Sequence, residues 1–179
     1  MTAKNTTEFV DPEFIVLNIA VLCASDTRTL SDDASGAYLA QALQNAGHSL
    51  HVRALVPDDK YQLRAKVSAW IADASVDVIL ITGGTGFTGR DGTPEAIAPL
   101  LDKAMPGFEV LMHQLSFADI GASTLQSRAI AGLANATFIF CLPGSKNACE
   151  TAWSKLIEPQ LDARSRPCNL VQLRDRLRE

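Results

Sequence analysis

The chain has 179 residues, a length that suits one domain built around one sizeable core. Apolar residues make up 47% of it, as in an ordinary globular enzyme, and the formal net charge is -4. Because no cluster of lysines and arginines accompanies this acidic balance, the composition argues against a nucleic-acid partner.

No targeting or membrane signal is present in the sequence. Met1–Pro12 is polar and acidic and has no apolar signal-peptide core. No apolar run approaches the roughly 20 residues that a membrane-spanning helix needs. We therefore expect a cytoplasmic protein with no membrane contact. It divides into a polar tail (1–14), a single domain (15–170) and a charged tail (171–179) that lies in solvent.

Apolar runs alternate with helical patterns from the start of the domain. Leu17–Ala24 is predicted as a buried strand, and a polar loop, Ser25–Asp33, follows it. The next helix ends at Gly47, and Ser49–Val56 is a second strand that ends at Pro57. Apolar residues at helical spacing define the first helix (Tyr38, Leu39, Ala42, Leu43 and Ala46) and the second (Leu63, Val67, Trp70, Ile71 and Ala74).

The middle of the chain continues this alternation. Val76–Thr82 is a third strand, apolar at almost every position after its start, as expected of a strand buried on both faces. Thr93 can cap the helix that follows, Pro94 fits its first position and Glu95 suits its dipole. We expect this helix to continue over Ala96–Ala104.

The last third has the same organisation. Thr124–Gly132 is predicted as a helix and Thr137–Leu142 as a strand, and Ser145 is predicted to cap a helix that runs through Ile157 and ends at Pro159. Alternating strands and helices imply an α/β fold with a mostly parallel, doubly wound sheet covered on both faces. Ligands bind such a sheet in the loops outside the carboxyl ends of its strands.

A glycine-rich loop follows the third strand. Thr82, Gly83, Gly84, Thr85 and Gly86 offer backbone N–H groups and hydroxyls to an anion. The loop is neither a Walker A motif nor the dinucleotide GxGxxG motif. A plain tight turn is the alternative, but four glycines within seven residues favour a substrate- or phosphate-binding loop.

Two aspartates follow strand ends at the same edge of the predicted sheet. Asp91 lies at the mouth of the next helix, where it is either a helix cap or dipole partner, or a carboxylate for Mg²⁺ beside a nucleotide phosphate. Asp58 follows the second strand. It belongs either to a plain polar turn or to a site in which it faces Asp91 across a bound metal.

Two further groups are candidates near this edge. Pro143, Gly144 and Ser145 form a strand-to-helix turn that is either structural or an anion cradle. Ser127 and Arg128 offer a hydroxyl and a guanidinium suited to a phosphate, although a charged helix face explains the arginine equally well.

The cysteines show no metal-ligand spacing. Cys23, Cys141, Cys149 and Cys168 form no CxxC pair and are interpreted as buried thiols. The three histidines are not spaced as zinc ligands either. We expect neither bound zinc nor haem.

Three segments together resemble the MoaB/MogA family, and its MoaB branch in particular. They are ITGGTGFTGRDGTPEAIAPLLDKAMPGF (Ile81–Phe108), GASTLQSRAIAGLANATFIFCLPGSKNACETAW (Gly121–Trp153) and PQLDARSRPCN (Pro159–Asn169). The resemblance runs from about Asn18 to Asn169. It implies a three-layer α/β/α sandwich that assembles as a homo-oligomer, either a trimer or a hexamer.

The resemblance also implies a role in molybdenum-cofactor biosynthesis. In the family's reaction, the terminal phosphate of molybdopterin attacks the α-phosphorus of ATP, giving adenylylated molybdopterin and pyrophosphate. This implies molybdopterin and a nucleotide (ATP or GTP) as substrates, Mg²⁺ as cofactor and other proteins of the pathway as partners. The alternative is a non-catalytic carrier or assembly protein that binds the same ligands.

The family's site residues carry over onto this chain by the same resemblance. Asp91 and Asp58 match the catalytic, metal-binding aspartates, and Thr82–Gly86 matches the anion loop. The Ser127–Arg128 segment matches one near the pterin phosphate, and Pro143–Ser145 matches one around the nucleotide.

The chain also departs from the family's pattern at two positions. Members often read PGFGE, then an aromatic residue or Met, then Arg. Here Val110 stands at the position of the glutamate and His113 at that of the arginine. These departures motivate the carrier alternative.

Overall fold

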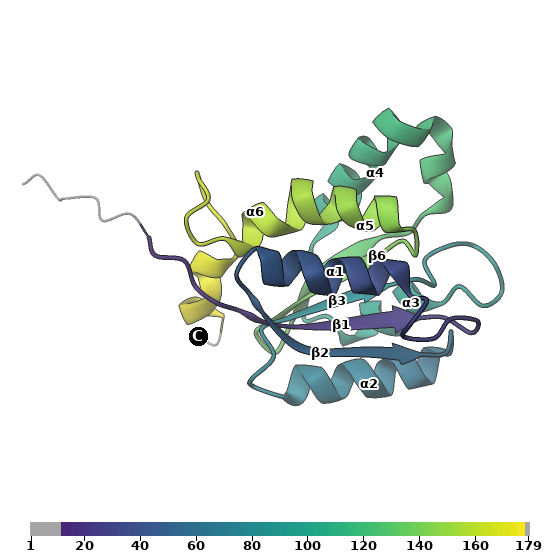
Figure 1. Cartoon of the computed structure of the whole chain (residues 1–179), viewed down its shortest axis with the longest axis horizontal. Coiled ribbons are helices and arrows are strands. Elements are labelled where there is room, and N and C mark those ends of the chain that lie inside the picture. Colours follow the sequence, from purple (N-terminus) through teal and green to yellow (C-terminus); the bar gives the residue numbers. More distant parts are fainter. Residues whose placement is uncertain (1–11, 178–179) are drawn as a thin grey trace, which may run out of the picture.

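The computed structural model describes residues 12–177, and its core is a six-stranded sheet (Figure 1). The strands are β1 (Asn18–Ala24), β2 (Ser49–Val56), β3 (Val78–Thr82), β4 (Lys103–Ala104), β5 (Ile130–Ala134) and β6 (Thr137–Leu142). They lie in the order β2-β1-β3-β6-β5-β4. The first four are parallel to one another, whereas β5 pairs antiparallel with both β6 and β4. The mostly parallel sheet predicted from the sequence is confirmed.

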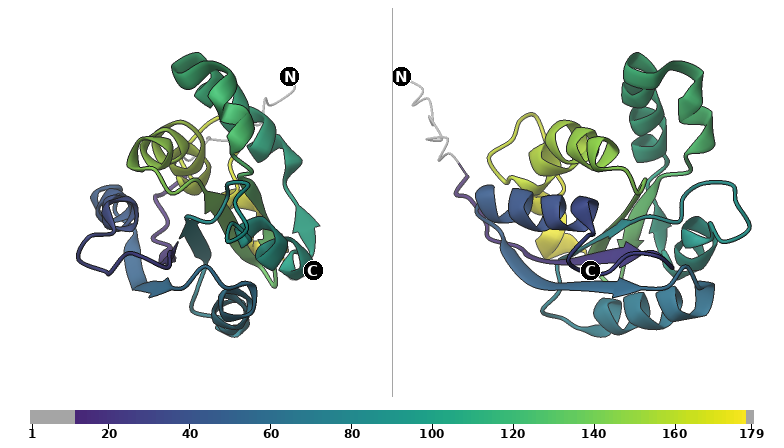
Figure 2. Two further views of the ribbon diagram at one scale, coloured as in Figure 1. Left: turned by 90° about the vertical axis from the view of Figure 1, so that its right-hand side faces the viewer. Right: turned by 45° about the vertical axis from the view of Figure 1, so that its right-hand side comes forward.

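Helices cover both faces of this sheet. They are α1 (Ala34–Asn45), α2 (Lys60–Ala72), α3 (Thr93–Ile97), α4 (Pro106–Ile120), α5 (Lys146–Ala152) and α6 (Glu158–Leu161), with the 3₁₀ segments η1 (Ala98–Leu100), η2 (Gly121–Gln126) and η4 (Val171–Arg176) and the π-helical segment η3 (Trp153–Ile157). Helices α1, α4, α5 and α6 lie on one face, and α2 and α3 lie on the other (Figures 1 and 2). The expected three-layer α/β/α sandwich is thus confirmed.

The layers follow from the alternation of side chains along the strands. In β1, Ile19 and Val21 belong to the core beneath α1 and α5, whereas Ala20 and Leu22 belong to the core against α2 and α3. All four are fully buried. Because successive side chains of a strand point to opposite faces, an uninterrupted apolar strand requires helices on both sides.

The strand order places a topological switch point at β1. The chain passes from β1 to β2 on one side and then returns to β3 on the other. The loops that follow β1 and β3 therefore diverge, which opens a crevice outside the carboxyl ends of the strands. We call this side of the sheet, where β1, β2, β3 and β6 end, the carboxyl edge. In Figure 1 the arrows of β1 and β2 point toward it.

Two of the predicted helices are partly wrong. Of the helix expected over 93–104, only Thr93–Ile97 is α-helical, and Lys103–Ala104 is strand β4. The segment Thr124–Gly132, expected as a helix, runs from η2 into β5. Gly132 permits this pairing, since a Cβ atom there would lie only 2.5 Å from the Lys103 carbonyl oxygen.

The helical layer also differs from the expectation after Trp153. Pro159 does not end the helix, because the chain continues through η3 into α6, where Pro159 occupies the first turn. Helix α4 lies where the sequence analysis predicts no element. Among the described residues, no helix is both long and apolar enough to cross a membrane.

The carboxyl-terminal segment packs against the domain. Val171 is buried in the core, and Arg174 forms a 2.7 Å ion pair with Asp77. In its described part, 171–177, this segment is exposed at 172–173 and 175–176, as expected of a solvated tail, but Val171 and Arg174 attach it to the domain. Residues 1–11 of the predicted polar tail, and residues 178–179, lie outside the described part of the chain.

The cysteines match their interpretation in three of four cases. Cys23, Cys141 and Cys149 are buried. Cys168 is exposed, so its interpretation as a buried thiol is wrong. Burial raises the pKa of the Cys23 thiol to about 12 and that of Cys149 to about 11. Both thiols are therefore neutral at physiological pH and unsuited to nucleophilic chemistry.

Candidate functional site

The glycine-rich turn between β3 and α3 lies at the centre of the carboxyl edge. Gly83 and Gly84 adopt φ angles of +99° and +62°, in the left-handed region that favours glycine. A Cβ atom on Gly83 would overlap the carbonyl oxygen of Ala24 at the end of β1. The Gly83 N–H donates to the carbonyl of Leu142 at the end of β6 (3.1 Å). The turn is thus fitted between the ends of β1 and β6, the two strands that flank β3, and a side chain at Gly83 would not fit there.

Threonine side chains hold this turn in place. Thr82 is buried, and its Oγ1 donates to the carbonyl of Pro143 (3.0 Å). Thr93, expected as a helix cap, instead donates from Oγ1 to the carbonyl of Gly83 (2.9 Å), and Gly92 occupies the cap position of α3. Both hydroxyls donate to carbonyls of the protein, so anion binding at the turn stays a prediction, one that would depend mainly on backbone N–H groups.

Asp91 lies half-buried in the loop that follows the turn. Its Oδ2 accepts hydrogen bonds from the Oγ1 and the N–H of Thr88, at 2.6 and 2.8 Å. The Thr88 hydroxyl contributes most to holding the pKa of Asp91 below its ordinary value, with further help from the charge of Arg128 and against the opposing effect of burial. Asp91 does not cap α3, so the capping alternative is wrong. An ionised carboxylate therefore stands at this position.

Asp58, in the loop after β2, has one carboxylate oxygen without a partner. Its Oδ2 accepts a hydrogen bond from the N–H of Asp26 (3.2 Å), and Oδ1 of Asp26 accepts one from the N–H of Asp58 (3.0 Å). The Oδ1 of Asp58 is buried and has no hydrogen-bond partner among the described residues. Burial, followed by the charges of Asp26 and Asp91, raises the pKa of Asp58 above its ordinary value. A cation would stabilise such a carboxylate.

Asp58 and Asp91 both approach glycines of the glycine-rich turn, where the absence of a side chain leaves room for a carboxylate. A Cβ atom on Gly84 would lie 2.9 Å from Oδ1 of Asp58, and one on Gly86 would lie 2.7 Å from Oδ2 of Asp91. The two carboxylates thus reach the same turn from two different loops. The structure brings together the residues that the sequence predicted as a catalytic and metal-binding pair.

The loop after β1 joins the site through Asp26, which the sequence analysis missed. Its carboxylate accepts hydrogen bonds from Nε and Nη2 of Arg90, at 2.7 and 2.9 Å. The hydrogen bonds from Arg90 lower the pKa of Asp26. The signal for Asp26 is its place in Ser25–Asp33, a polar loop that also follows a parallel strand. Arg90 is adjacent to Asp91 in the chain, but nothing in its local sequence points to Asp26.

Arg128 lies beside the loop that carries Asp91, and its guanidinium binds protein atoms. Nε and Nη2 donate to the carbonyl of Gly86 (2.9 and 2.6 Å), Nη2 also donates to the carbonyl of Asp91 (3.0 Å), and Nη1 pairs with Glu95. Ser127 differs, because its Oγ is buried without a partner among the described residues. Phosphate binding by these two residues stays a prediction.

The turn after β6 adjoins the glycine-rich turn. Oγ of Ser145 accepts a hydrogen bond from the N–H of Ala148 (3.2 Å), so its predicted role as the cap of α5 is confirmed. A Cβ atom on Gly144 would lie 3.3 Å from the Cα of Gly83. Pro143, Gly144 and Ser145 therefore lie next to the anion loop, while their contact with a nucleotide stays a prediction.

A polar pocket of about 380 Å³ opens beside the two aspartates. It is lined by Asp58, Asp59, Lys60, Tyr61, Gly89, Arg90, Asp91, Gly92 and Glu95. Within residues 12–177, no group of three or more His, Cys, Asp or Glu side chains is placed to hold a metal ion. Two carboxylates suit Mg²⁺, which keeps waters and phosphate oxygens as its other ligands, better than they suit zinc.

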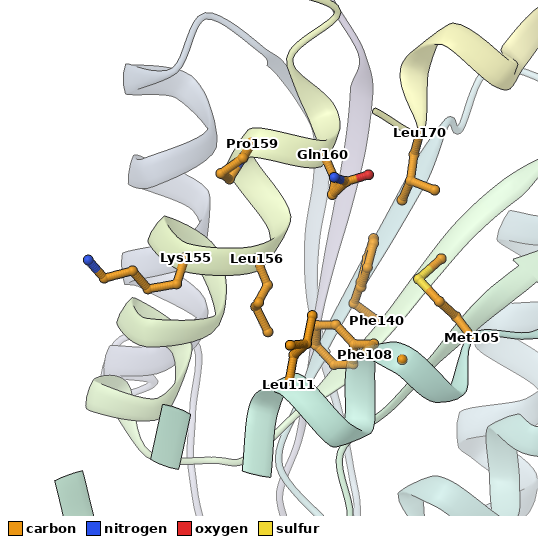
Figure 3. A pocket seen from close by; sticks show the side chains of 10 residues that line it. Met105, Phe108, Leu111, Phe140, Lys155, Leu156, Pro159, Gln160 and Leu170 are labelled. Carbon is orange, nitrogen blue, oxygen red and sulfur yellow. The ribbon is translucent and has the colours of Figure 1, made fainter. Parts of the chain in front are cut away.

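A second pocket, of about 330 Å³, lies between α4, η3 and α6 (Figure 3). Met105, Phe108, Leu111, Phe140 and Leu156 make its wall mostly apolar, and the Lys155 side chain extends away from them (Figure 3). Its lining contains no acidic side chain and none of the predicted site residues. The carboxyl edge is therefore the better candidate for phosphate chemistry.

We expect the Asp58→Asn variant to melt about 2 °C above the unmodified protein near neutral pH without added metal. Because the folded-state pKa of Asp58 is raised, ionisation of its carboxyl costs stability as the pH rises from the ordinary value of 3.8 through the folded value. Below that window the carboxyl is protonated in both states, and the gain should vanish. Thermal unfolding followed by circular dichroism between about pH 3 and pH 8 measures this difference.

Asp59→Asn is the matched control for this experiment. Asp59 caps α2 by accepting hydrogen bonds from the N–H groups of Tyr61 and Gln62, and asparagine caps equally well. An equal stabilisation in both variants, or one that persists unchanged in acid, would contradict the assignment of the effect to the Asp58 carboxyl.

The fold and the loops of the carboxyl edge define a class of α/β proteins in which one doubly wound domain carries a glycine-rich turn and two aspartates beyond the ends of its strands. A family model described as a probable molybdopterin binding domain matches residues 20–163. The Molybdenum cofactor biosynthesis protein B of Escherichia coli (strain K12) is 54% identical over 160 residues, which cover 89% of this chain and 94% of that protein.

Solved structures agree with this comparison. A crystal structure of a Molybdenum cofactor biosynthesis protein B has a TM-score of 0.80 and 41% identity, and the match covers 82% of this chain and 92% of that one. The tungsten cofactor synthesizing protein MoaB from Pyrococcus furiosus has a TM-score of 0.68 and 33% identity, with coverage of 76% and 87%. The chain belongs to the MoaB/MogA family of molybdenum-cofactor biosynthesis proteins.

Proposed function

We propose that this protein is a molybdopterin adenylyltransferase that uses ATP and Mg²⁺ and releases pyrophosphate. The observation that carries the proposal is the pair of carboxylates, Asp58 and Asp91, that reach one glycine-rich turn from two loops. One oxygen of Asp58 is buried there without a partner among the described residues. The family model, which describes molybdopterin binding, supports the choice of pterin substrate.

The residues at this edge fit Mg²⁺. The ion takes one or two carboxylates and completes its shell with waters and substrate phosphates. Asp91, with its lowered pKa, would bind as a carboxylate, and a cation would lower the raised pKa of Asp58. When bound, Mg²⁺ would neutralise charge on the nucleotide phosphates.

The protein's own contribution is positioning more than acid–base catalysis. The nucleophile, the terminal phosphate of molybdopterin, is already anionic and needs no strong base. Its oxygen bonds to the α-phosphorus of ATP, while the bond from that phosphorus to the bridging oxygen of the leaving pyrophosphate breaks. The backbone N–H groups of the glycine-rich turn and the guanidinium of Arg90 would orient the phosphates for this displacement.

The test is pyrophosphate release by the full chain supplied with molybdopterin, ATP and Mg²⁺. We expect release only when all three are present, and its loss when the metal is removed with a chelator. Release from ATP without molybdopterin would indicate hydrolysis. Release that survives chelation would contradict the assignment of Asp58 and Asp91 to a metal.

A carrier that binds molybdopterin without turnover is the second candidate, and the two departures from the family pattern favour it. Val110 is exposed on α4, and the Nδ1 of His113 is hydrogen-bonded to Oγ1 of Thr124 (3.0 Å). Neither residue lines the polar pocket. Saturable molybdopterin binding without pyrophosphate release would establish this alternative. Val110 and His113 would then be the first positions at which to restore the glutamate and the arginine of the family pattern.

We also propose that the chain forms a homo-oligomer. Large apolar side chains are exposed along α4 and η2, which is typical of an interaction surface. They are Val110, Leu111, Phe117, Ile120 and Leu125. Sedimentation velocity of the purified chain measures its mass and separates a trimer from a hexamer, and a monomer would contradict the proposal.

A further inference from the structure

We propose that Arg128 is a positioning residue that fixes the loop carrying Asp91, and that it is not a ligand of a substrate phosphate. The inference rests on the proposed function only for its kinetic readout. Its structural content concerns one guanidinium and the two ends of one loop, which runs from Gly86 to Asp91.

The hydrogen bonds of the guanidinium clamp both ends of this loop. Nε and Nη2 donate to the carbonyl of Gly86, where the loop leaves the glycine-rich turn (2.9 and 2.6 Å). Nη2 also donates to the carbonyl of Asp91, where the loop enters α3 (3.0 Å). One planar group thus sets the separation of two carbonyls that lie five positions apart in the sequence.

Arg128 is itself anchored outside the loop. Its backbone N–H donates to the carbonyl of Thr85 (3.1 Å), and its Nη1 pairs with Glu95 on α3. Within the loop, the centroid of the Phe87 ring lies 5.0 Å from the guanidinium carbon. The side chain is only 23% exposed. These contacts hold the guanidinium in one orientation, so it can act as a rigid clamp.

Few donors remain for a substrate. A guanidinium has five N–H donors. Both N–H groups of Nη2, the N–H of Nε and one of the two N–H groups of Nη1 are directed at Gly86, Asp91 and Glu95. One N–H of Nη1 remains, so a phosphate could accept a single hydrogen bond. The bidentate contact that arginine usually makes with a phosphate would have to displace the carboxylate of Glu95 or one of the two loop carbonyls.

The geometry connects this clamp to the metal-binding pair. Oδ2 of Asp91 lies against Gly86, so the distance between Gly86 and Asp91 sets where this carboxylate stands. Asp58 approaches the same turn at Gly84. Loss of the clamp would change the position of one carboxylate relative to the other while leaving both in place.

The test compares Arg128→Gln with the matched control Arg64→Gln in the full chain. Arg64 also clamps carbonyls, those of Glu95 and Ala96, but these lie in α3 and not in the loop. For Arg128→Gln we expect amide hydrogen exchange over 87–91 to accelerate about tenfold or more, with β3 and β6 unchanged. We also expect the half-saturating Mg²⁺ concentration to rise about tenfold, with kcat at saturating Mg²⁺ kept within about threefold. Arg128→Lys should be intermediate, because an ammonium cannot replace a planar fork.

Each outcome decides between the two roles. Unchanged exchange over 87–91 with a raised KM for molybdopterin alone would make Arg128 a substrate ligand and overturn the proposal. Equal effects in Arg64→Gln would reduce Arg128 to a general structural contact and would also overturn it. If the unmodified protein releases no pyrophosphate, the proposed function fails, but the exchange of 87–91 still tests the clamp.

Discussion

Asp91→Asn is expected to lower pyrophosphate release by about 100-fold or more, with a melting temperature within about 3 °C of the unmodified protein. The asparagine keeps an oxygen that accepts the hydrogen bonds from the N–H and Oγ1 of Thr88, so the local turn persists. What it loses is the negative charge, which the proposed function requires beside the nucleotide phosphates. Steady-state pyrophosphate release at saturating ATP, together with thermal unfolding, measures both quantities.

Asp102→Asn provides the comparison for this variant. Oδ2 of Asp102 also accepts a backbone hydrogen bond, from the N–H of Asn135 (2.8 Å), but this contact lies beside β4 and β5 and away from the polar pocket. The two replacements remove the same charge and keep the same kind of acceptor. Full activity in Asp91→Asn would exclude it from catalysis, and equal losses in both variants would indicate an effect of net charge.

The parallel half of the fold could be predicted because its strands are buried on both faces. β1, β3 and β6 are short apolar runs in the sequence. Because parallel strands end at the same edge of a sheet, the polar loops that follow them were expected to meet there. β5 could not be recognised in the same way, since Ile130–Ala134 has only one β-branched residue and a glycine. It is a strand because it pairs with β6, to which a two-residue turn joins it, and with Lys103–Ala104, which comes from a more distant part of the chain.

The candidate site shows the same division between local and distant information. Asp58, Asp91 and the glycines follow strand ends, so their convergence at the carboxyl edge follows from the order of elements. The orientation of the side chains at this edge does not follow from the order of elements. Arg128 could be predicted as a cation near the site, but its hydrogen bonds to the carbonyls of Gly86 and Asp91 depend on how the segment between η2 and β5 lies against the loop. The pairing of Asp26 with Arg90 joins residues 64 positions apart.

Gly84→Ala is expected to destabilise the protein by about 2 to 4 kcal/mol, which lowers its melting temperature by roughly 5 to 10 °C, and to abolish Mg²⁺-dependent activity. Gly84 has a φ of +62°, which L side chains rarely adopt. Its added Cβ atom would overlap Oγ1 of Thr93 and lie 2.9 Å from Oδ1 of Asp58. The methyl group would therefore displace the threonine that holds the turn and occupy space beside the unpaired carboxylate oxygen. Thermal unfolding and Mg²⁺-dependent pyrophosphate release measure the two effects.

Gly47→Ala separates backbone strain from damage to the site. Gly47 also has a positive φ, +94°, but it follows α1 away from the carboxyl edge, and the nearest atoms to its added Cβ would belong to the Phe14 ring, at 3.1 Å. We expect this variant to lose stability, by about 1 kcal/mol, while keeping its Mg²⁺ dependence. If Gly84→Ala kept full activity below its melting temperature, Oδ1 of Asp58 would not need the space beside Gly84. The cation would then have to be held by Asp91 without Asp58, since the contact at Gly84 is what brings Asp58 to the turn.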